Sequence, residues 1–91
     1  MGVAEIIRSK LTVAFAPTHL DIVDESSLHA GHAQARPDGE SHFRIEIVAA
    51  AFDGASRVER QRMIYRVLAD ELAGRVHALA LTVRTPGEVA V

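Results

Sequence analysis

Along the chain, the spacing of the apolar residues changes between the period of a helix and that of a strand. The order in which these spacings follow one another is the sequence feature that most limits the possible folds. Over Val3–Phe15 apolar residues recur every three or four positions, which predicts an amphipathic helix that stops before Pro17. Over 19–24, and again over 41–47, apolar and polar residues alternate, as in half-buried strands. We therefore predict a helix followed by two strands that pair antiparallel.

A second helix is predicted from a capping sequence. Ser56 and Glu59 fit the S-x-x-E pattern, in which each side chain bonds an unpaired amide of the first helical turn. We expect Gly74 to close this helix in the left-handed conformation. The apolar residues between these points are spaced to form one core face, namely Met63, Ile64, Val67, Leu68 and Leu72.

A third strand is predicted over Val76–Thr85, with its larger apolar residues and one histidine on one face. The small residues of the other face would allow close packing of a helix. The first face has His77, Leu79, Leu81 and Val83, and the second has Val76, Ala78 and Ala80. A strand, a helix and a strand in succession imply a right-handed parallel crossover.

Thr85, Pro86 and Glu88 predict the start of a further, short helix. The complete order predicts an α+β fold, αββαβ with this final helix added. Two helices would lie on one face of a mixed three-stranded sheet.

Composition excludes several classes of protein. The 91 residues make one domain, 1–91, whose 48% hydrophobic and 24% charged residues are typical of a globular fold. A net charge of -2 gives no overall attraction to nucleic acids or anionic membranes. The chain has no cysteine, so it has no thiolate with which to form a disulfide, attack a substrate or hold a cluster. No apolar run is long enough to span a membrane and the start does not fit a secretory signal, so we expect a soluble, cytoplasmic protein.

The stretch over 25–40 connects the first two predicted strands and has no apolar period. It contains His29 and His32 among glycine, proline and small polar residues. Loops of this length are uncommon in compact domains and tend to be functional. This hairpin loop is therefore a candidate functional region.

Six short strings occur in the order and spacing of the BolA family, and the sequence resembles that family over nearly its whole length. The resemblance implies an αββαβ core related to class II KH domains and a function other than catalysis. Members of the family bind monothiol glutaredoxins, with which they share a 2Fe-2S cluster, and regulate iron homeostasis, cell shape and, in bacteria, transcription. The strings are Asp24-Glu25-Ser26, Glu40-Ser41-His42-Phe43, Phe52-x-Gly54, Arg60-Gln61-Arg62-Met63-Ile64-Tyr65, Glu71-Leu72 and Val76-His77-Ala78-Leu79.

The resemblance also assigns cluster ligands. The family's invariant ligand falls on His77, and its loop ligand falls on His29, with His32 as the alternative because the loop here is longer. Two imidazoles on one iron and thiolates on the other make a Rieske-like cluster. The thiolates would come from the glutaredoxin and from glutathione, so we expect no cofactor in the isolated protein. The simpler interpretation is a structural histidine at His77 and solvated histidines in the loop.

Four arginines of the second predicted helix form a second candidate site: Arg57, Arg60, Arg62 and Arg66. The first two lie in the opening turn, where the helix dipole favours acidic residues, and such a broken local rule often marks a functional site. These side chains could hold glutathione carboxylates, acidic groups of a glutaredoxin or DNA phosphates, or they could form a solvated face. The turn at Gly54 lacks the second glycine of a KH loop, which argues against KH-type RNA binding.

Two hypotheses about function follow. The first is an adaptor that binds a monothiol glutaredoxin and co-ligates a glutathione-bound 2Fe-2S cluster for iron–sulfur trafficking or iron homeostasis. The alternative is a DNA-binding transcriptional regulator of cell morphology and stress response that acts through the second helix. No carboxylate pair, nucleophile elbow or phosphate loop indicates an enzyme.

Overall fold

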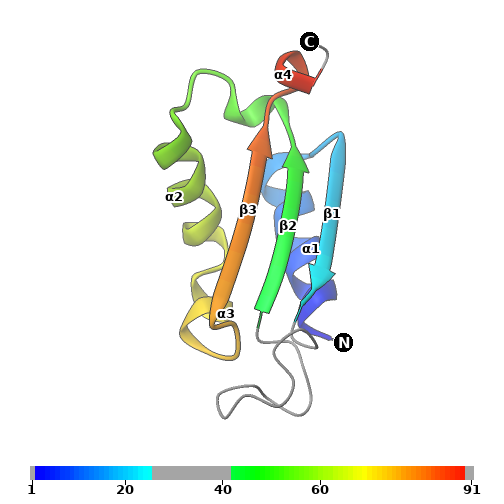
Figure 1. Cartoon of the computed structure of the whole chain (residues 1–91), viewed down its shortest axis with the longest axis vertical. Coiled ribbons are helices and arrows are strands. Elements are labelled where there is room, and N and C mark those ends of the chain that lie inside the picture. Colours follow the sequence, from blue (N-terminus) through cyan, green and yellow to red (C-terminus); the bar gives the residue numbers. More distant parts are fainter. Residues whose placement is uncertain (1, 26–41, 90–91) are drawn as a thin grey trace.

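The computed structural model describes residues 2–25 and 42–89, and its elements follow the predicted order (Figure 1). A helix and two strands come first, and a helical region, a strand and a short helix come next. The elements are α1 (Val3–Phe15), β1 (His19–Asp24), β2 (His42–Val48), a 3-10 turn (Ala50–Phe52), α2 (Arg57–Val67), α3 (Ala69–Ala73), β3 (Ala78–Arg84) and α4 (Pro86–Val89).

Within the described residues the sheet has three strands in the order β1-β2-β3. β1 pairs antiparallel with β2, and β2 pairs parallel with β3. Ile45 in the central strand lies beside Ile22 on one side and Leu81 on the other, so one apolar row crosses the whole sheet. The predicted mixed three-stranded sheet is confirmed.

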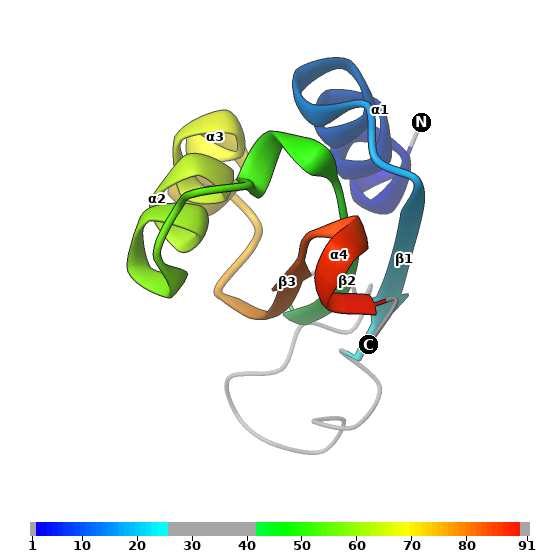
Figure 2. The same ribbon diagram turned by 90° about the horizontal axis from the view of Figure 1, so that it is seen from above.

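The helices α1, α2 and α3 lie on one face of this sheet, and no described element covers the other face (Figure 2). The core lies between the two layers. Burying one side chain of this kind stabilises the fold by about 1.5–3 kcal/mol. The largest fully buried side chains come from α1, β2, the 3-10 turn and the second helical region: Ile7, Leu11, Phe43, Ile45, Ile47, Phe52, Ile64 and Leu68. No helix in the described part of the chain is long and apolar enough to cross a membrane.

The second helical region differs from the single helix that was predicted. It breaks at Leu68, and Gly74 has φ -106°, so the left-handed closure at Gly74 was wrong. The Glu71 carbonyl instead accepts hydrogen bonds from the amides of Gly74 and Val76, which ends α3 without a left-handed residue. The Glu71 carboxylate accepts hydrogen bonds from Lys10 Nζ at 2.9 Å through both oxygens, and this ion pair links α3 to α1.

The predicted faces of the third strand are also partly wrong. β3 begins at Ala78, so the alternation does not extend back to His77, which is exposed while Val76 is buried. Ala78 and Ala80 are exposed on the sheet face that no described helix covers, whereas Leu81 and its apolar neighbours pack toward the core. The small residues therefore do not serve helix packing.

Candidate functional site

His77 lies at the start of β3, at the end of the sheet where the chain leaves β1 and enters β2. Its side chain is exposed, and its ring centroid is 6.4 Å from that of His42, the first residue of β2. The Glu25 amide donates a hydrogen bond of 2.8 Å to the His42 carbonyl, which fixes the two described ends of the hairpin connection side by side. His77 therefore lies beside the β2 end of the segment that carries the loop histidines, and the β1 end of that segment is one strand farther away.

His29 and His32 lie outside the described residues. Within the described residues, no group of three or more His, Cys, Asp or Glu side chains is arranged to hold a metal ion. The side chain of His77 is exposed, and imidazole is a normal ligand for iron. His77 fits the role of one ligand in a set completed from elsewhere.

Arg60 is committed to contacts inside the protein. Its side chain is only 14% exposed, its Nε donates to the Ala55 carbonyl at 3.0 Å, and its Nη1 donates to the Val83 carbonyl at 3.2 Å. The same Nη1 lies 2.8 Å from Glu88 Oε1 in an ion pair. Arg60 thus connects the start of α2, the end of β3 and α4, and its predicted contact with a partner stays a prediction.

The start of α4 is a complete capping box, as its sequence predicted. The Thr85 amide donates to Glu88 Oε1 at 2.7 Å, and the Glu88 amide donates to Thr85 Oγ1 at 3.3 Å. The hydrogen bond from Arg60, followed by the one from the Thr85 amide, lowers the pKa of Glu88 from its ordinary 4.5 to about 2. Glu88 therefore stays charged, and α4 is fastened to the body of the protein.

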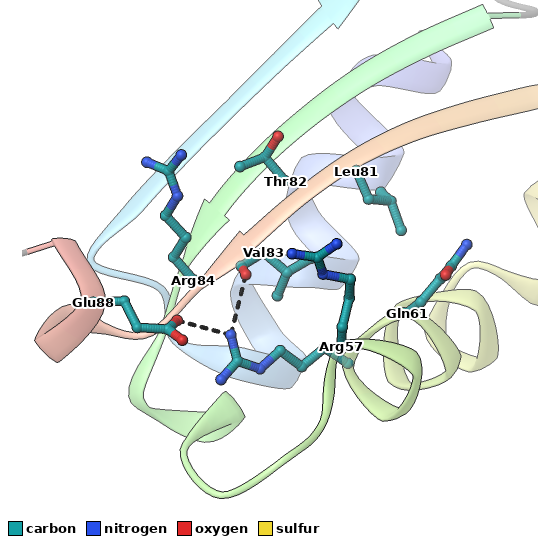
Figure 3. A pocket seen from close by; sticks show the side chains of 8 residues that line it. Arg57, Gln61, Leu81, Thr82, Val83, Arg84 and Glu88 are labelled. Atoms are coloured by element: carbon teal, nitrogen blue, oxygen red, sulfur yellow. Dashed lines mark hydrogen bonds and ion pairs between the residues drawn. The ribbon is translucent and has the colours of Figure 1, made fainter.

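A pocket of about 610 Å³ opens between α2 and β3 beside this capping box (Figure 3). Neither Arg57 nor Arg84 forms an ion pair with another residue that the structure describes, so both guanidinium groups are available there. The lining residues are Arg57, Arg60, Gln61, Leu81, Thr82, Val83, Arg84 and Glu88.

The four arginines that were predicted as one site are divided between two places. Arg57 and Arg60 line the pocket, while Arg62 and Arg66 are exposed elsewhere on α2. Sequence reasoning did not select Arg84, which faces the same pocket from β3. One sequence signal could have found Arg84. In a strand–helix–strand crossover the end of the second strand lies near the start of the helix, and Arg84 ends that strand.

Comparison with known families identifies the chain. The family model described as BolA-like protein matches residues 11–88, which is most of the chain. The chain belongs to the BolA-like family. The resemblance found in the six sequence strings is therefore confirmed.

Several curated proteins are similar to this BolA-like chain. SufE-like protein 1, chloroplastic/mitochondrial, of Arabidopsis thaliana is 47% identical over 87 residues, covering 91% of this chain and 24% of that protein. BolA-like protein 1 of Homo sapiens is 43% identical over 82 residues, covering 90% of this chain and 57% of that protein. The DNA-binding transcriptional regulator BolA of Escherichia coli (strain K12) is 46% identical over 81 residues, covering 89% and 73%. The chain thus spans about a quarter of the first of these relatives and less than three fifths of the second.

Solved structures of BolA-like proteins share the fold. BolA1 from Arabidopsis thaliana superposes with a TM-score of 0.87 at 40% identity, covering 97% of this chain and 96% of that one. The BolA domain of SufE1 from Arabidopsis thaliana gives a TM-score of 0.86 at 44% identity, covering 97% and 98%. The mixed sheet with its helices is the BolA fold.

Proposed function

We propose that this BolA-like chain is an adaptor that binds a monothiol glutaredoxin and co-ligates a glutathione-bound 2Fe-2S cluster for iron–sulfur trafficking or iron homeostasis. His77 supplies one ligand, and His29 or His32 supplies the other. The observation that carries the proposal is the position of His77, which is exposed and lies beside His42, one described end of the segment that contains the two loop histidines.

The surroundings of His77 favour a ligand over a structural histidine. Within the described residues its imidazole makes no hydrogen bond, and its ring centroid lies 6.4 Å from that of His42, so metal ligation would break no internal hydrogen bond. The backbone just after His77 is fixed by the pairing of Ala78 with His42. The ligand therefore sits on a rigid strand end rather than on a free surface.

An incomplete ligand set suits an adaptor. The cluster, when bound, supplies transferable iron and sulfide and a redox centre. This chain contributes neutral imidazole and has no thiolate, so the remaining ligands must come from the glutaredoxin and glutathione. Because iron binds only neutral imidazole, acid should release the cluster from its histidine side.

The test is anaerobic co-purification with a monothiol glutaredoxin and glutathione, followed by visible absorbance and circular dichroism. We expect a coloured complex whose spectrum changes in His77→Ala and in either His29→Ala or His32→Ala, but not in His19→Ala. His19 is a matched control because it is exposed and pairs with Glu46 elsewhere on the sheet. A spectrum that is the same in His77→Ala as in wild type would contradict the ligand assignment. A cluster that is equally stable at about pH 5 and about pH 8 would also contradict it.

DNA-binding transcriptional regulation, of cell morphology and stress response, is the second candidate. It is favoured by the printed name of the Escherichia coli relative and by the exposed Arg57, Arg62 and Arg66 of α2. Phosphate contacts release counterions, so affinity for duplex DNA should fall steeply with salt and fall further when these arginines become glutamine. A gel shift that shows no binding at about 50 mM salt would exclude this candidate.

A further inference from the structure

We propose that the groove between α2 and β3 receives an extended acidic peptide segment of a partner protein, which adds as a strand to the open edge of β3. The groove is the 610 Å³ pocket lined by Arg57, Gln61, Leu81 and Arg84 together with their neighbours. It lies at the far end of β3 from His77, so the inference goes beyond cluster binding and does not depend on it (Figure 1).

The backbone of β3 has one paired side and one open side. In a parallel pair, the amide and carbonyl of one residue point the same way, and successive residues alternate. The Arg84 carbonyl accepts a hydrogen bond from Ala49 on the β2 side, whereas the Val83 carbonyl accepts one from Arg60 on the α2 side. The amides and carbonyls of Leu81 and Leu79 therefore point in the same direction as those of Val83, toward the groove.

This row is a template for strand addition at every group except the Val83 carbonyl, which already accepts a hydrogen bond from Arg60. Unpaired amides and carbonyls at a sheet edge bind extended peptides through main-chain hydrogen bonds, and side-chain pockets then supply specificity. Four lining residues, Leu81 to Arg84, follow one another along the edge. At about 3.3 Å per strand residue, the groove accommodates about four residues of an added strand.

The charge of the groove selects an acidic segment. Arg57 extends from α2 toward β3, and Arg84 lies on the strand itself (Figure 3). Arg60 is neutralised by Glu88, so these two guanidinium groups are the unneutralised charges among the described lining residues. Neighbouring residues of a strand point to opposite faces, so two adjacent carboxylates could reach Arg57 on one face and Arg84 on the other.

The arrangement favours a peptide over a nucleic acid. A nucleic acid needs a continuous track of cations along its phosphates, but here the Glu88 carboxylate lines the same groove and neutralises Arg60. A peptide backbone uses both the donors and the acceptors of the open edge, and apolar peptide side chains would meet Leu81 and Val83.

The probe is the capped hexapeptide Thr-Val-Glu-Glu-Val-Thr, titrated into the full chain and followed by NMR. Binding should shift the amide signals of Leu81 and Val83 and slow their hydrogen exchange, while Ala80 and Thr82 change little because they already pair with β2. Methylating alternate peptide nitrogens should weaken binding about tenfold or more, since it removes main-chain hydrogen bonds.

Charge variants complete the test. Arg57→Gln, Arg84→Gln and a peptide with Gln in place of Glu should each weaken binding about two- to fivefold. Arg62→Gln is the matched control, because Arg62 lies on the same helix outside the groove, and it should leave affinity unchanged. No shift at millimolar peptide, equal binding of the methylated peptide, or displacement of the peptide by short single-stranded DNA at lower concentration would each overturn the proposal. None of these outcomes bears on His77 and the cluster.

Discussion

The two ends of β3 use their polar side chains in opposite ways. At the start of the strand, His77 is exposed and has no hydrogen bond within the described residues. At the end of the strand, Arg60 and Glu88 bond each other, the backbone and the capping box. One end leaves an imidazole that the fold does not use, and the other uses the ion pair between Arg60 and Glu88 to hold α4 in place.

This difference shows that charge and exposure must be considered together when a site is assigned. Arg60 looks functional in the sequence because it breaks the helix-dipole rule, yet its position is explained by three internal contacts. His77 looks structural by its position near an apolar strand, yet no contact in the described part of the chain requires it. Residues needed for folding and residues free to bind a ligand should therefore separate between the two ends of β3.

The largest effect is expected from the strand that supports both ends. Ile45→Ala empties a fully buried position at the centre of the sheet and should lower the free energy of unfolding by about 2–5 kcal/mol. Both ends of β3 should then lose their structure together. Urea unfolding measures the effect, and Val13→Ala, at a position that is 85% exposed, should change stability by less than about 0.5 kcal/mol.

A smaller loss is expected at the end of β3 where charges serve folding. Arg60→Met removes the bonds to Ala55, Val83 and Glu88 and should cost about 1–3 kcal/mol of folding free energy. Arg57→Met, on the same helical turn but without an ion pair to any described residue, should cost less than about 0.5 kcal/mol. Urea unfolding measures both variants. If the two substitutions lower the free energy of unfolding equally, Arg60 is no more important for folding than Arg57.

Acid should weaken the same end. Because the folded pKa of Glu88 is lowered from 4.5 to about 2, its ionised form stabilises the fold fully above pH 4.5, and this contribution is lost as the pH falls toward about 2. Wild type should therefore be more stable than Glu88→Gln at neutral pH, and the difference should disappear near pH 2. Stability curves of both proteins against pH measure this, and added salt should reduce the difference because Glu88 is partly exposed.

The smallest effect is expected at the start of β3. His77→Ala should change the free energy of unfolding of the protein without cluster by less than about 0.5 kcal/mol, because the side chain is exposed. The same variant is expected to alter the spectrum of the glutaredoxin complex. A large loss of stability would show that His77 is a structural residue, so the two ends of β3 would not differ in their importance for folding.

The elements were predictable wherever their signals are local. Three such signals predicted helices correctly, and each depends on residues within a few turns. They are the amphipathic period of Val3–Phe15, which spans α1, and the capping pairs at Ser56 and Thr85, which begin α2 and α4. The break at Leu68 was missed, and so was the ion pair between Lys10 and Glu71, which are distant in the sequence. No local pattern reports such a pair.

The candidate sites were predictable only in part, for the same reason. His77 was selected through the family motif, although its face was assigned incorrectly because the predicted strand began two residues too early, at Val76 rather than Ala78. Arg84 was missed because it meets Arg57 only where the fold brings the end of β3 beside the start of α2. The assignments of His29 and His32 lie outside the described residues and stay predictions.

The sheet topology has a further consequence for how the chain reaches its native state. No pair of neighbouring strands is joined by a tight turn, since residues 25–41 separate β1 from β2 and residues 49–77 separate β2 from β3. Both ladders therefore require closure of long segments, whose entropic cost rises with length, and such non-local pairing slows folding. During synthesis β3 is the last of the three strands to emerge from the ribosome. Before it pairs, one edge of β2 lacks its partner and can pair with other chains. The central strand β2, which pairs with both other strands in the native sheet, is thus also the segment at which early aggregation would begin.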